Sequence, residues 1–331
     1  MHSMRFAARV LALVLAVTGC GTGGGEAARA PDAEATLLLD FQPSAVHTGI
    51  YMATERGFDT AEGIDLEVQV PSSSSDAVRL LLAGETDFAV LDIHDLALAR
   101  EQDRDLVAVM AIVRRPLASV LALPPAQRPR DLAGQRVGVT GLPSDEAALD
   151  TVVAGDGGDP AKVERVSIGF NAVASLLGGE VAGATAFWNV EGLALQRQRP
   201  EARIFRVDDF GAPRYPELLL TVTRETLQDR PAEVRATVAA LVRGYERTLA
   251  DPEGAASTLI DATEGLSRDM VLAQLQAVQP AFRAGGRIGE LNTAELREWA
   301  MWEAEVGITG RPPEVELMFD GDLVPVDTEA G

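Results

Sequence analysis

The sequence is poor in cysteine, lysine and aromatic residues, and it lacks the common catalytic motifs. Its 331 residues include one cysteine, Cys20, one lysine, Lys162, and only 5% aromatic residues. The formal net charge of −21 argues against a nucleic-acid partner, because nucleic acids are bound through basic patches. The chain contains no GxSxG elbow, P-loop, GxGxxG motif or His/Cys cluster with metal-ligand spacing. These absences predict a protein that is not an enzyme and that carries no cofactor, metal or catalytic residue.

The single cysteine ends an N-terminal export signal. Residues 1–20 combine two arginines with a short apolar run and small residues before Cys20. A run of this length is typical of a secretory signal and is too short to span a membrane. The segment 15–20 resembles a bacterial lipobox, whose cysteine is acylated and becomes the mature N-terminus; a plain signal peptide with an incidental cysteine is the alternative. We expect lipidation at Cys20, a flexible tether over 21–35, and an extracytoplasmic protein anchored to the cell membrane by its lipid alone.

Strand-like and helix-like stretches alternate through the rest of the chain, which is long for a single core. Short apolar or alternating runs predict strands at 37–41, 64–70, 87–91, 106–113, 136–140, 163–168 and 182–187. One helix is predicted after Ser44 and another after the N-cap candidates at 72–75. Further helices are predicted at 96–100, 145–153, 172–177, 231–250, 252–262, 268–278 and 292–305. This alternation predicts an α/β fold with two lobes, each a mostly parallel sheet flanked by helices.

Two nine-residue segments, 81–89 and 176–184, echo each other. In each, a helix ends at a glycine, the favoured residue at this position, and a strand follows at once. Each copy forms the third strand of a βαβαβ run, so we expect two homologous lobes. The two strands lead to Asp92 and to Trp188, and ligands bind beyond the carboxyl ends of such strands. These ends and the turn at 42–44 are therefore predicted to meet in one cleft.

The start of the folded part carries the most distinctive residues. They are Leu39-Asp40-Phe41-Gln42-Pro43-Ser44, with His47, Gly49 and Tyr51. This pattern resembles the Leu-Asp-Trp-x-Pro-Asn-x-x-His-x-Gly-x-Tyr opening of the thiamine-pyrimidine precursor-binding (NMT1-like) family of ABC-importer lipoproteins. It departs from that opening at Phe41, where the family usually has Trp, and at Ser44, where the family has Asn. The segments 115–119, 141–146, 188–192 and 209–218 are similar to the family too.

The resemblance, which covers about residues 36–222, implies a type II periplasmic-binding-protein fold with hinge crossovers. Lobe one would comprise 36–118 and 222–331, and lobe two 119–221. The implied function is capture of a formylaminopyrimidine or hydroxymethylpyrimidine in the interlobe cleft, with ABC permease and ATPase subunits as partners. A fungal enzyme of the same broad family builds the pyrimidine, but that activity is associated with a cysteine-rich segment and a cofactor lysine. Here the cysteine belongs to the signal, and Lys162 is expected to face solvent.

The implied ligand sets the chemistry of the expected site. A neutral aminopyrimidine needs an aromatic stack and a few hydrogen-bonding groups rather than a charge clamp. Trp188 and Tyr51 could sandwich the ring, and Asn189 and Glu191 could read its amine and a ring nitrogen; core packing and helix capping are the alternatives. The expected ligand-binding residues are Asp40, Gln42, Ser44, His47, Tyr51, Asp92, Asp145, Glu146, Trp188, Asn189, Glu191 and Tyr215. The pair His94-Asp95 is expected to be a solvated helix start.

Two other ligand classes remain open at this point. One is another flat heterocycle such as riboflavin. The other is a sulfonate such as taurine, which would favour a helix N-terminus and an arginine, so that Arg114 or Arg115 would matter.

Overall fold

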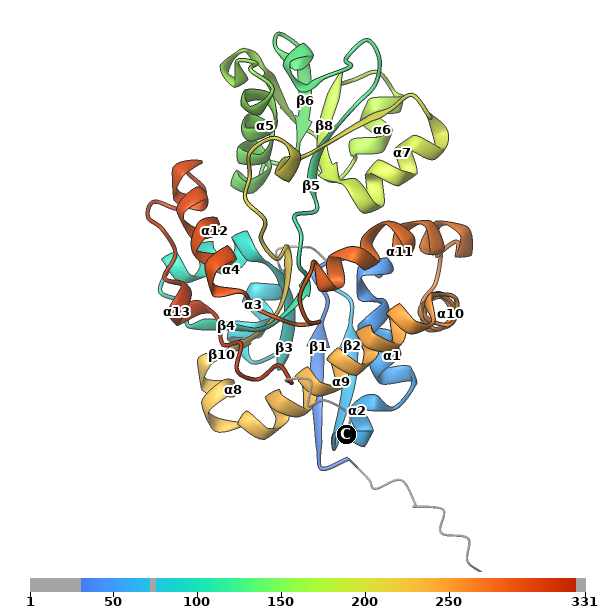
Figure 1. The fold of residues 1–331 in the computed structure, drawn as a ribbon, viewed down its shortest axis with the longest axis vertical. Helices are drawn as coiled ribbons and strands as arrows, with labels where there is room; N and C mark the ends of the chain where they lie inside the picture. Colours follow the sequence, from blue (N-terminus) through green and yellow to red (C-terminus); the bar gives the residue numbers. More distant parts are fainter. Residues whose placement is uncertain (1–30, 72–75, 326–331) are drawn as a thin grey trace, which may run out of the picture.

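The computed structural model describes residues 31–71 and 76–325 (Figure 1). The predicted signal, the predicted lipidation site Cys20, most of the predicted tether and the N-cap candidates at 72–75 lie outside the described residues. The first strand begins at Ala33, so the predicted tether at 21–35 overlaps the fold by three residues. No helix in the described ranges has the length and hydropathy of a membrane span.

Lobe one is built on a five-stranded sheet. Its strand order is β2 (Ile64–Gln69), β1 (Ala33–Leu38), β3 (Phe88–Asp92), β10 (Leu218–Thr223) and β4 (Leu106–Val113). Strand β1 pairs in parallel with β2 and β3, whereas β10 runs antiparallel to both β3 and β4. All eight residues of β4 are buried, as expected for a strand covered on both faces.

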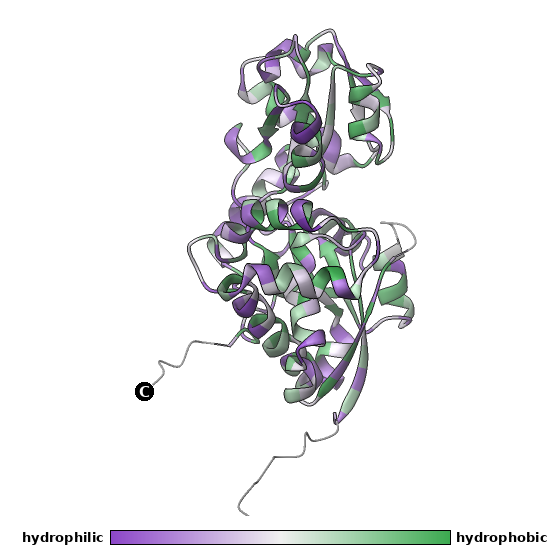
Figure 2. Ribbon diagram, turned by 90° about the vertical axis from the view of Figure 1, so that its right-hand side faces the viewer, coloured by the Kyte–Doolittle hydropathy of each residue, from purple (hydrophilic) through white to green (hydrophobic). Residues whose placement is uncertain are grey.

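Helices cover both faces of this sheet because side chains alternate along each strand. In β1, Leu37 packs into one hydrophobic cluster and Leu38 into the other. The first cluster includes residues of α1 (Thr48–Glu55), α9 (Pro231–Ala250), α10 (Pro252–Ala262) and α11 (Arg268–Arg283). The second includes residues of α3 (Asp76–Ala83), α4 (Ile93–Glu101), α12 (Thr293–Glu305) and α13 (Val315–Met318). The short helices α2 (Phe58–Ala61) and α8 (Arg224–Asp229) complete the lobe. In Figure 2 hydrophobic strands and inner helix faces lie inside each lobe.

Lobe two repeats this plan on a smaller scale. Its strand order is β7 (Glu164–Ser167), β6 (Arg136–Val139), β8 (Gly183–Phe187), β5 (Ala118–Ala122) and β9 (Arg203–Arg206). Its helices are α5 (Pro143–Gly155), α6 (Ala172–Leu177) and α7 (Leu193–Gln198). As in lobe one, the first strand of the βαβαβ run lies between the second and the third, and an antiparallel strand flanks the third. The echoed glycines Gly84 and Gly179 both have φ of 69°, a left-handed conformation that favours glycine.

The chain crosses between the lobes twice. The first crossing lies between β4 and β5, at 114–117, and the second between β9 and β10, at 207–217. The predicted boundary between residues 221 and 222 is therefore wrong, since it cuts through β10, which is hydrogen-bonded within the sheet of lobe one. Strands β5, β9 and β10 are also absent from the sequence prediction.

Helix α1, which follows the predicted cleft loop, is held by an unusually close approach to α9. A Cβ built on Gly244 would lie 2.0 Å from the carbonyl oxygen of Gly49, and one on Gly49 would lie 2.3 Å from the Tyr245 ring. Both positions therefore require glycine. The Tyr245 hydroxyl also donates a hydrogen bond of 2.7 Å to the Val46 carbonyl, which ties the start of α1 to α9.

A candidate ligand-binding cleft between the lobes

The carboxyl ends of the parallel strands in the two lobes face each other across the crossings (Figure 1). At the end of β3, the amide of Ile93 donates to the carbonyl of Glu217 in the second crossing at 3.0 Å. At the end of β8, the amide of Trp188 donates to the carbonyl of Leu117 in the first crossing, also at 3.0 Å. Both strand ends therefore contact a crossing segment at the junction between the lobes, and their convergence on one ligand-binding cleft stays a prediction.

The loop after β1 is shaped by His47. The Ser44 amide donates to His47 Nδ1 at 3.0 Å, so Nδ1 is the unprotonated nitrogen. His47 Nε2 lies 2.7 Å from an oxygen of Asp40 and therefore donates to it. Since both ring nitrogens are engaged and the ring is buried, His47 positions Asp40 and Ser44. Asp40 itself remains partly exposed at the mouth of the cleft.

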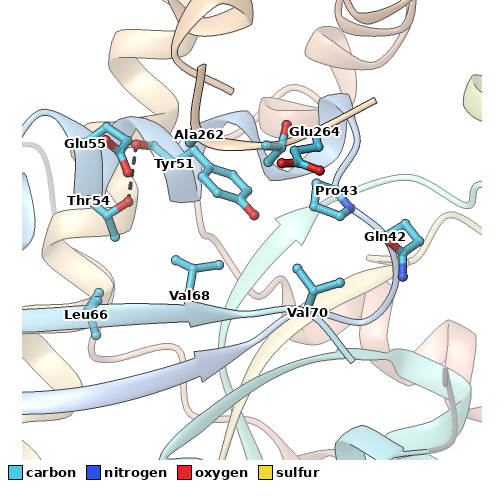
Figure 3. Close-up of a pocket in the computed structure, with 11 residues that line it drawn as sticks. Gln42, Pro43, Tyr51, Thr54, Glu55, Leu66, Val68, Val70, Ala262 and Glu264 are labelled. Carbon is cyan, nitrogen blue, oxygen red and sulfur yellow. Dashed lines mark hydrogen bonds between the residues drawn. The ribbon is translucent and has the colours of Figure 1, made fainter. Parts of the chain in front are cut away.

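Gln42 and Tyr51 line a pocket of about 530 Å³ beside this loop (Figure 3). Its walls come from α1, β2 and the segment after α10; the lining residues are Gln42, Pro43, Tyr51, Thr54, Glu55, Leu66, Val68, Val70, Ala262, Thr263 and Glu264. The Tyr51 ring projects into the pocket from α1. Burial and, to a lesser degree, the Glu55 carboxylate raise the pKa of its phenol, which stays a neutral donor. The structure thus brings two predicted site residues, Gln42 and Tyr51, to one cavity.

Trp188 is placed differently from the prediction. Its side chain is 2% exposed and belongs to a hydrophobic core cluster. The indole N–H donates to the Pro116 carbonyl at 2.9 Å, and the Arg206 guanidinium lies 4.0 Å from the ring centroid. The structure therefore shows core packing, the alternative left open for Trp188, because the crossing and Arg206 cover the ring.

Asn189 and Glu191 have buried side-chain atoms that lack hydrogen-bond partners among the described residues. They lie on a π-helix, Trp188–Gly192, directly after β8, and single π turns of this kind often occur at functional sites. Among the described residues, neither the amide oxygen nor the amide nitrogen of the fully buried Asn189 has a hydrogen-bond partner, and neither does Glu191 Oε2. Each such buried polar group costs about 1–3 kcal/mol. Burial raises the pKa of Glu191, and the nearby Asp145 carboxylate adds to this.

The two acids predicted at the start of α5 differ in role. Asp145 accepts from the Thr140 amide at 3.0 Å and also from the Thr140 hydroxyl, so it fixes the loop after β6. Because its charge acts on Glu191, both carboxylates face the same region of lobe two. Glu146 is exposed.

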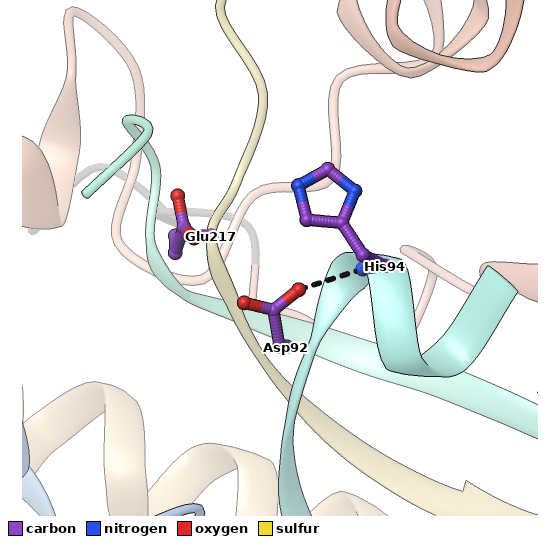
Figure 4. Close-up of side chains that lie close together, drawn as sticks. All are labelled: Asp92, His94 and Glu217. Carbon is purple, nitrogen blue, oxygen red and sulfur yellow. Dashed lines mark hydrogen bonds between the residues drawn. The ribbon is translucent and has the colours of Figure 1, made fainter. Parts of the chain in front are cut away.

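Asp92, His94 and Glu217 gather at the hinge (Figure 4). Asp92 caps α4 by accepting from the His94 amide at 2.7 Å, and Glu217 accepts from the Leu117 amide at 2.5 Å. His94 Nδ1 lies 2.7 Å from Glu303 Oε2 on α12, and both side chains are buried. The predicted solvated helix start at His94 is therefore wrong, because α12 covers it.

The same network contains Tyr215, whose contacts explain why its side chain is buried. Its hydroxyl lies 3.3 Å from His94 Nε2, and its ring stacks on Trp302 with centroids 5.6 Å apart. This predicted ligand residue is 1% exposed, so the structure places it in the hinge core. Glu217, Trp302 and Glu303 were missed, since no local pattern links positions so far apart in the sequence.

Charge in this network is balanced by protons. Burial alone would lower the pKa of His94, but the Glu303 and Asp92 carboxylates outweigh it and raise the pKa to about 10. Burial, with the mutual repulsion of the two carboxylates, raises the pKa of Glu217 well above its usual range, and burial raises that of Asp92. Within the described ranges, the atoms that Asp92, His94 and Glu217 offer lie within 4.8 Å of one another and form the one group that could bring three ligands to a metal. Protein groups already engage all three side chains, and the expectation of a metal-free protein stays a prediction.

Arg114 and Arg115, one of which a sulfonate would need, are both already paired. Arg114 is buried and binds the carbonyls of Arg283 and Arg287, with Glu290 at 3.4 Å. Arg115 binds Asp208 at 2.7 Å. These pairings disfavour the sulfonate alternative.

Known proteins similar to this chain agree with this architecture. The NMT1/THI5 like family model matches residues 44–255. A formylaminopyrimidine-binding protein from Halalkalibacterium halodurans is 32% identical over 258 residues, which are 76% of this chain and 78% of the relative. A 4-amino-5-hydroxymethyl-2-methylpyrimidine phosphate synthase from Saccharomyces cerevisiae is 25% identical over 255 residues, which are 73% of this chain and 74% of the relative.

Solved structures show the fold. The periplasmic aliphatic sulphonate binding protein of Escherichia coli superposes with a TM-score of 0.72 at 14% identity, covering 91% of this chain and 95% of that one. The ligand binding component of an ABC-type import system from Staphylococcus aureus superposes with a TM-score of 0.71 at 13% identity, covering 88% of this chain and 97% of that one. The expected two-lobed binding-protein fold is confirmed. From the family match and the 32% identical relative, the chain belongs to the NMT1/THI5-like family.

Proposed function

We propose that this protein captures a small, neutral, planar nitrogen heterocycle, a formylaminopyrimidine or a hydroxymethylpyrimidine, in the interlobe cleft and delivers it to an ABC importer. The observation that carries the proposal is a set of buried polar atoms without partners after β8: both amide atoms of Asn189 and one carboxylate oxygen of Glu191. Asn189 offers a donor and an acceptor, and Glu191 offers an acceptor. An aminopyrimidine edge alternates donors and acceptors and complements such a set.

The energetic argument is that the ligand supplies what the empty protein lacks. Hydrogen bonds to a charged group contribute about 1.5–3 kcal/mol, and leaving a buried polar group unpaired costs about 1–3 kcal/mol. A ligand that pairs Asn189 and Glu191 therefore gains binding energy that is not available to an aliphatic competitor. The acidic and neutral groups of the cleft, Asp40, Asp145 and Glu191 among them, disfavour an anionic ligand.

Calorimetry with purified protein tests the proposal, using hydroxymethylpyrimidine and formylaminopyrimidine alongside riboflavin and taurine. Glu191→Gln should weaken pyrimidine binding at least about tenfold, in line with loss of a charged hydrogen bond. Asn189→Leu should do the same while leaving the ligand-free protein at least as stable, because the amide has no partner to lose. Glu180→Gln, an exposed charge change in the same lobe, is the matched control. Binding of riboflavin or taurine instead of a pyrimidine would refute the ligand assignment.

We also propose that the protein is not a synthase. Lys162 is 69% exposed and lies 3.3 Å from Asp159, which supports the expectation that it faces solvent rather than holding a cofactor. Incubation with pyridoxal phosphate and iron should yield no pyrimidine; product formation above a heat-denatured control would overturn this part of the proposal. The proposed location is extracytoplasmic, with a lipid on Cys20.

A further inference from the structure

Half of the exposed large hydrophobic side chains follow strand ends that face the other lobe. Within the described residues, eight large hydrophobic side chains are exposed: Phe41, Val70, Leu82, Leu142, Phe170, Leu177, Met301 and Leu317. Four of them follow the carboxyl ends of equivalent strands in the two lobes. Phe41 follows β1 and Leu142 follows β6, while Val70 follows β2 and Phe170 follows β7. A repeated apolar position at ligand-facing strand ends indicates apolar cleft walls.

Two of these side chains already meet across the gap. The rings of Phe41 and Phe170 have centroids 5.4 Å apart and an interplanar angle of 37°. They nevertheless remain 39% and 57% exposed, so their contact lies at the mouth of the cleft rather than in a core. Neither loop is loose, since His47 holds the first through Asp40, and the Asn171 side chain donates to the Ile168 carbonyl in the second at 3.1 Å.

We propose that Phe41 and Phe170 form an aromatic gate, which a ligand must part and whose rings then pack on the ligand. The proposal rests on the proposed function and deepens it, because it explains a preference for flat rings. Parting the gate loses one ring contact, worth about 0.5–1.5 kcal/mol. A heteroaromatic ligand restores that contact with its own ring, whereas an aliphatic ligand does not. The gate thus selects planar rings, and the polar groups after β8 select among them.

Dissociation kinetics test the gate in the presence of ligand. Phe170→Ala should raise the dissociation rate of hydroxymethylpyrimidine about 2- to 12-fold, the factor that corresponds to one aromatic contact. Phe170→Tyr should restore the wild-type rate because it keeps the ring. Leu177→Ala removes an exposed hydrophobic side chain of the same lobe and should change nothing. If the wild-type protein binds the pyrimidine and Phe170→Ala releases it at the wild-type rate, the gate is wrong and the proposed function stands.

A crosslinking experiment tests the gate without any ligand. The Cys20→Ala chain contains no other cysteine, so Phe41→Cys with Phe170→Cys introduces a unique pair. A short bismaleimide should join this pair in the ligand-free protein. It should not join Phe170→Cys to Leu317→Cys, because α13 lies on the side of lobe one away from α6, the helix that follows Phe170 (Figure 1). Absence of the first crosslink would overturn the gate whatever the ligand is. Failure of the wild-type protein to bind any pyrimidine, with the crosslink intact, would refute only the proposed ligand.

Discussion

Replacement of Glu217 by Gln should change how stability depends on pH. Glu217 is 1% exposed and joins both crossings, since its carboxylate accepts from the Leu117 amide and its own amide donates to the Val113 carbonyl at 2.8 Å. Its pKa is raised by burial and by Asp92, so the folded protein keeps a proton that the unfolded chain releases. Gln retains an acceptor oxygen for Leu117 and stays neutral at every pH.

The sign of the effect follows from proton uptake. A group whose pKa is higher in the folded state binds more protons there, so the free energy of unfolding falls as pH rises between the two pKa values. Each proton taken up contributes a slope of about 1.4 kcal/mol per pH unit. Glu217 lowers the free energy of unfolding as pH rises from the ordinary carboxyl range upwards. His94, whose pKa is raised to about 10, does the same above about pH 6.5. The stability from these two groups should therefore be fully present only below about pH 4, and it should be lost progressively as the pH rises from there to alkaline values.

Urea unfolding followed by circular dichroism at pH 5, 6, 7 and 8 measures this slope. For Glu217→Gln it should be less steep than for the wild type by up to about 1.4 kcal/mol per pH unit, with the largest gain in stability at pH 8. The matched control is Glu305→Gln on α12, which removes an exposed carboxylate and should leave the slope unchanged. A Glu217→Gln variant with the wild-type slope, or one destabilised equally at every pH, would show that Glu217 holds no extra proton in the fold.

Three further perturbations follow from the structure. Gly244→Ala should lower the free energy of unfolding by about 1–3 kcal/mol or more, measured in urea, because its Cβ would lie 2.0 Å from the Gly49 carbonyl oxygen. Trp188→Phe should cost about 1–3 kcal/mol by leaving the buried Pro116 carbonyl without its donor; an unchanged urea midpoint would argue against this buried bond. Cys20→Ala should leave the protein unacylated by mass spectrometry, and an unlipidated wild-type mature protein would contradict the proposed anchor.

The elements that could be predicted are those encoded in local patterns. The predicted strand at 106–113 coincides with β4, since a strand buried on both faces reads as a continuous apolar run. The predicted helices at 172–177, 231–250 and 252–262 coincide with α6, α9 and α10. Strands β5, β9 and β10 were missed because they are stabilised by antiparallel pairing with strands far away in the sequence. The lobe boundary was wrong for the same reason.

For the candidate site, the positions of the segments could be predicted, but the contacts of their side chains could not. The sequence could place the loop from Asp40 to Ser44 and the turn after β8 directly after the carboxyl ends of β1 and β8, the strand ends at which ligands bind in such sheets. What could not be predicted is how each side chain is used. His94 bonds Glu303, which lies 209 positions further along the chain. Likewise Trp188 is covered by Arg206 from a strand that the sequence did not predict.

The antiparallel strands beside β3 and β8 place the proposed binding site next to the crossings between the lobes. Because β10 flanks β3 and β5 flanks β8, each crossing enters its sheet next to the strand whose carboxyl end faces the cleft. Asp92 at the end of β3 therefore lies beside Glu217 in one crossing, and Trp188 at the end of β8 bonds Pro116 in the other. A ligand that pairs Asn189 and Glu191 acts one turn away from these hinge contacts. In the proposed function, the binding energy would therefore act beside the crossings, which is the arrangement that a cleft-closing binder requires.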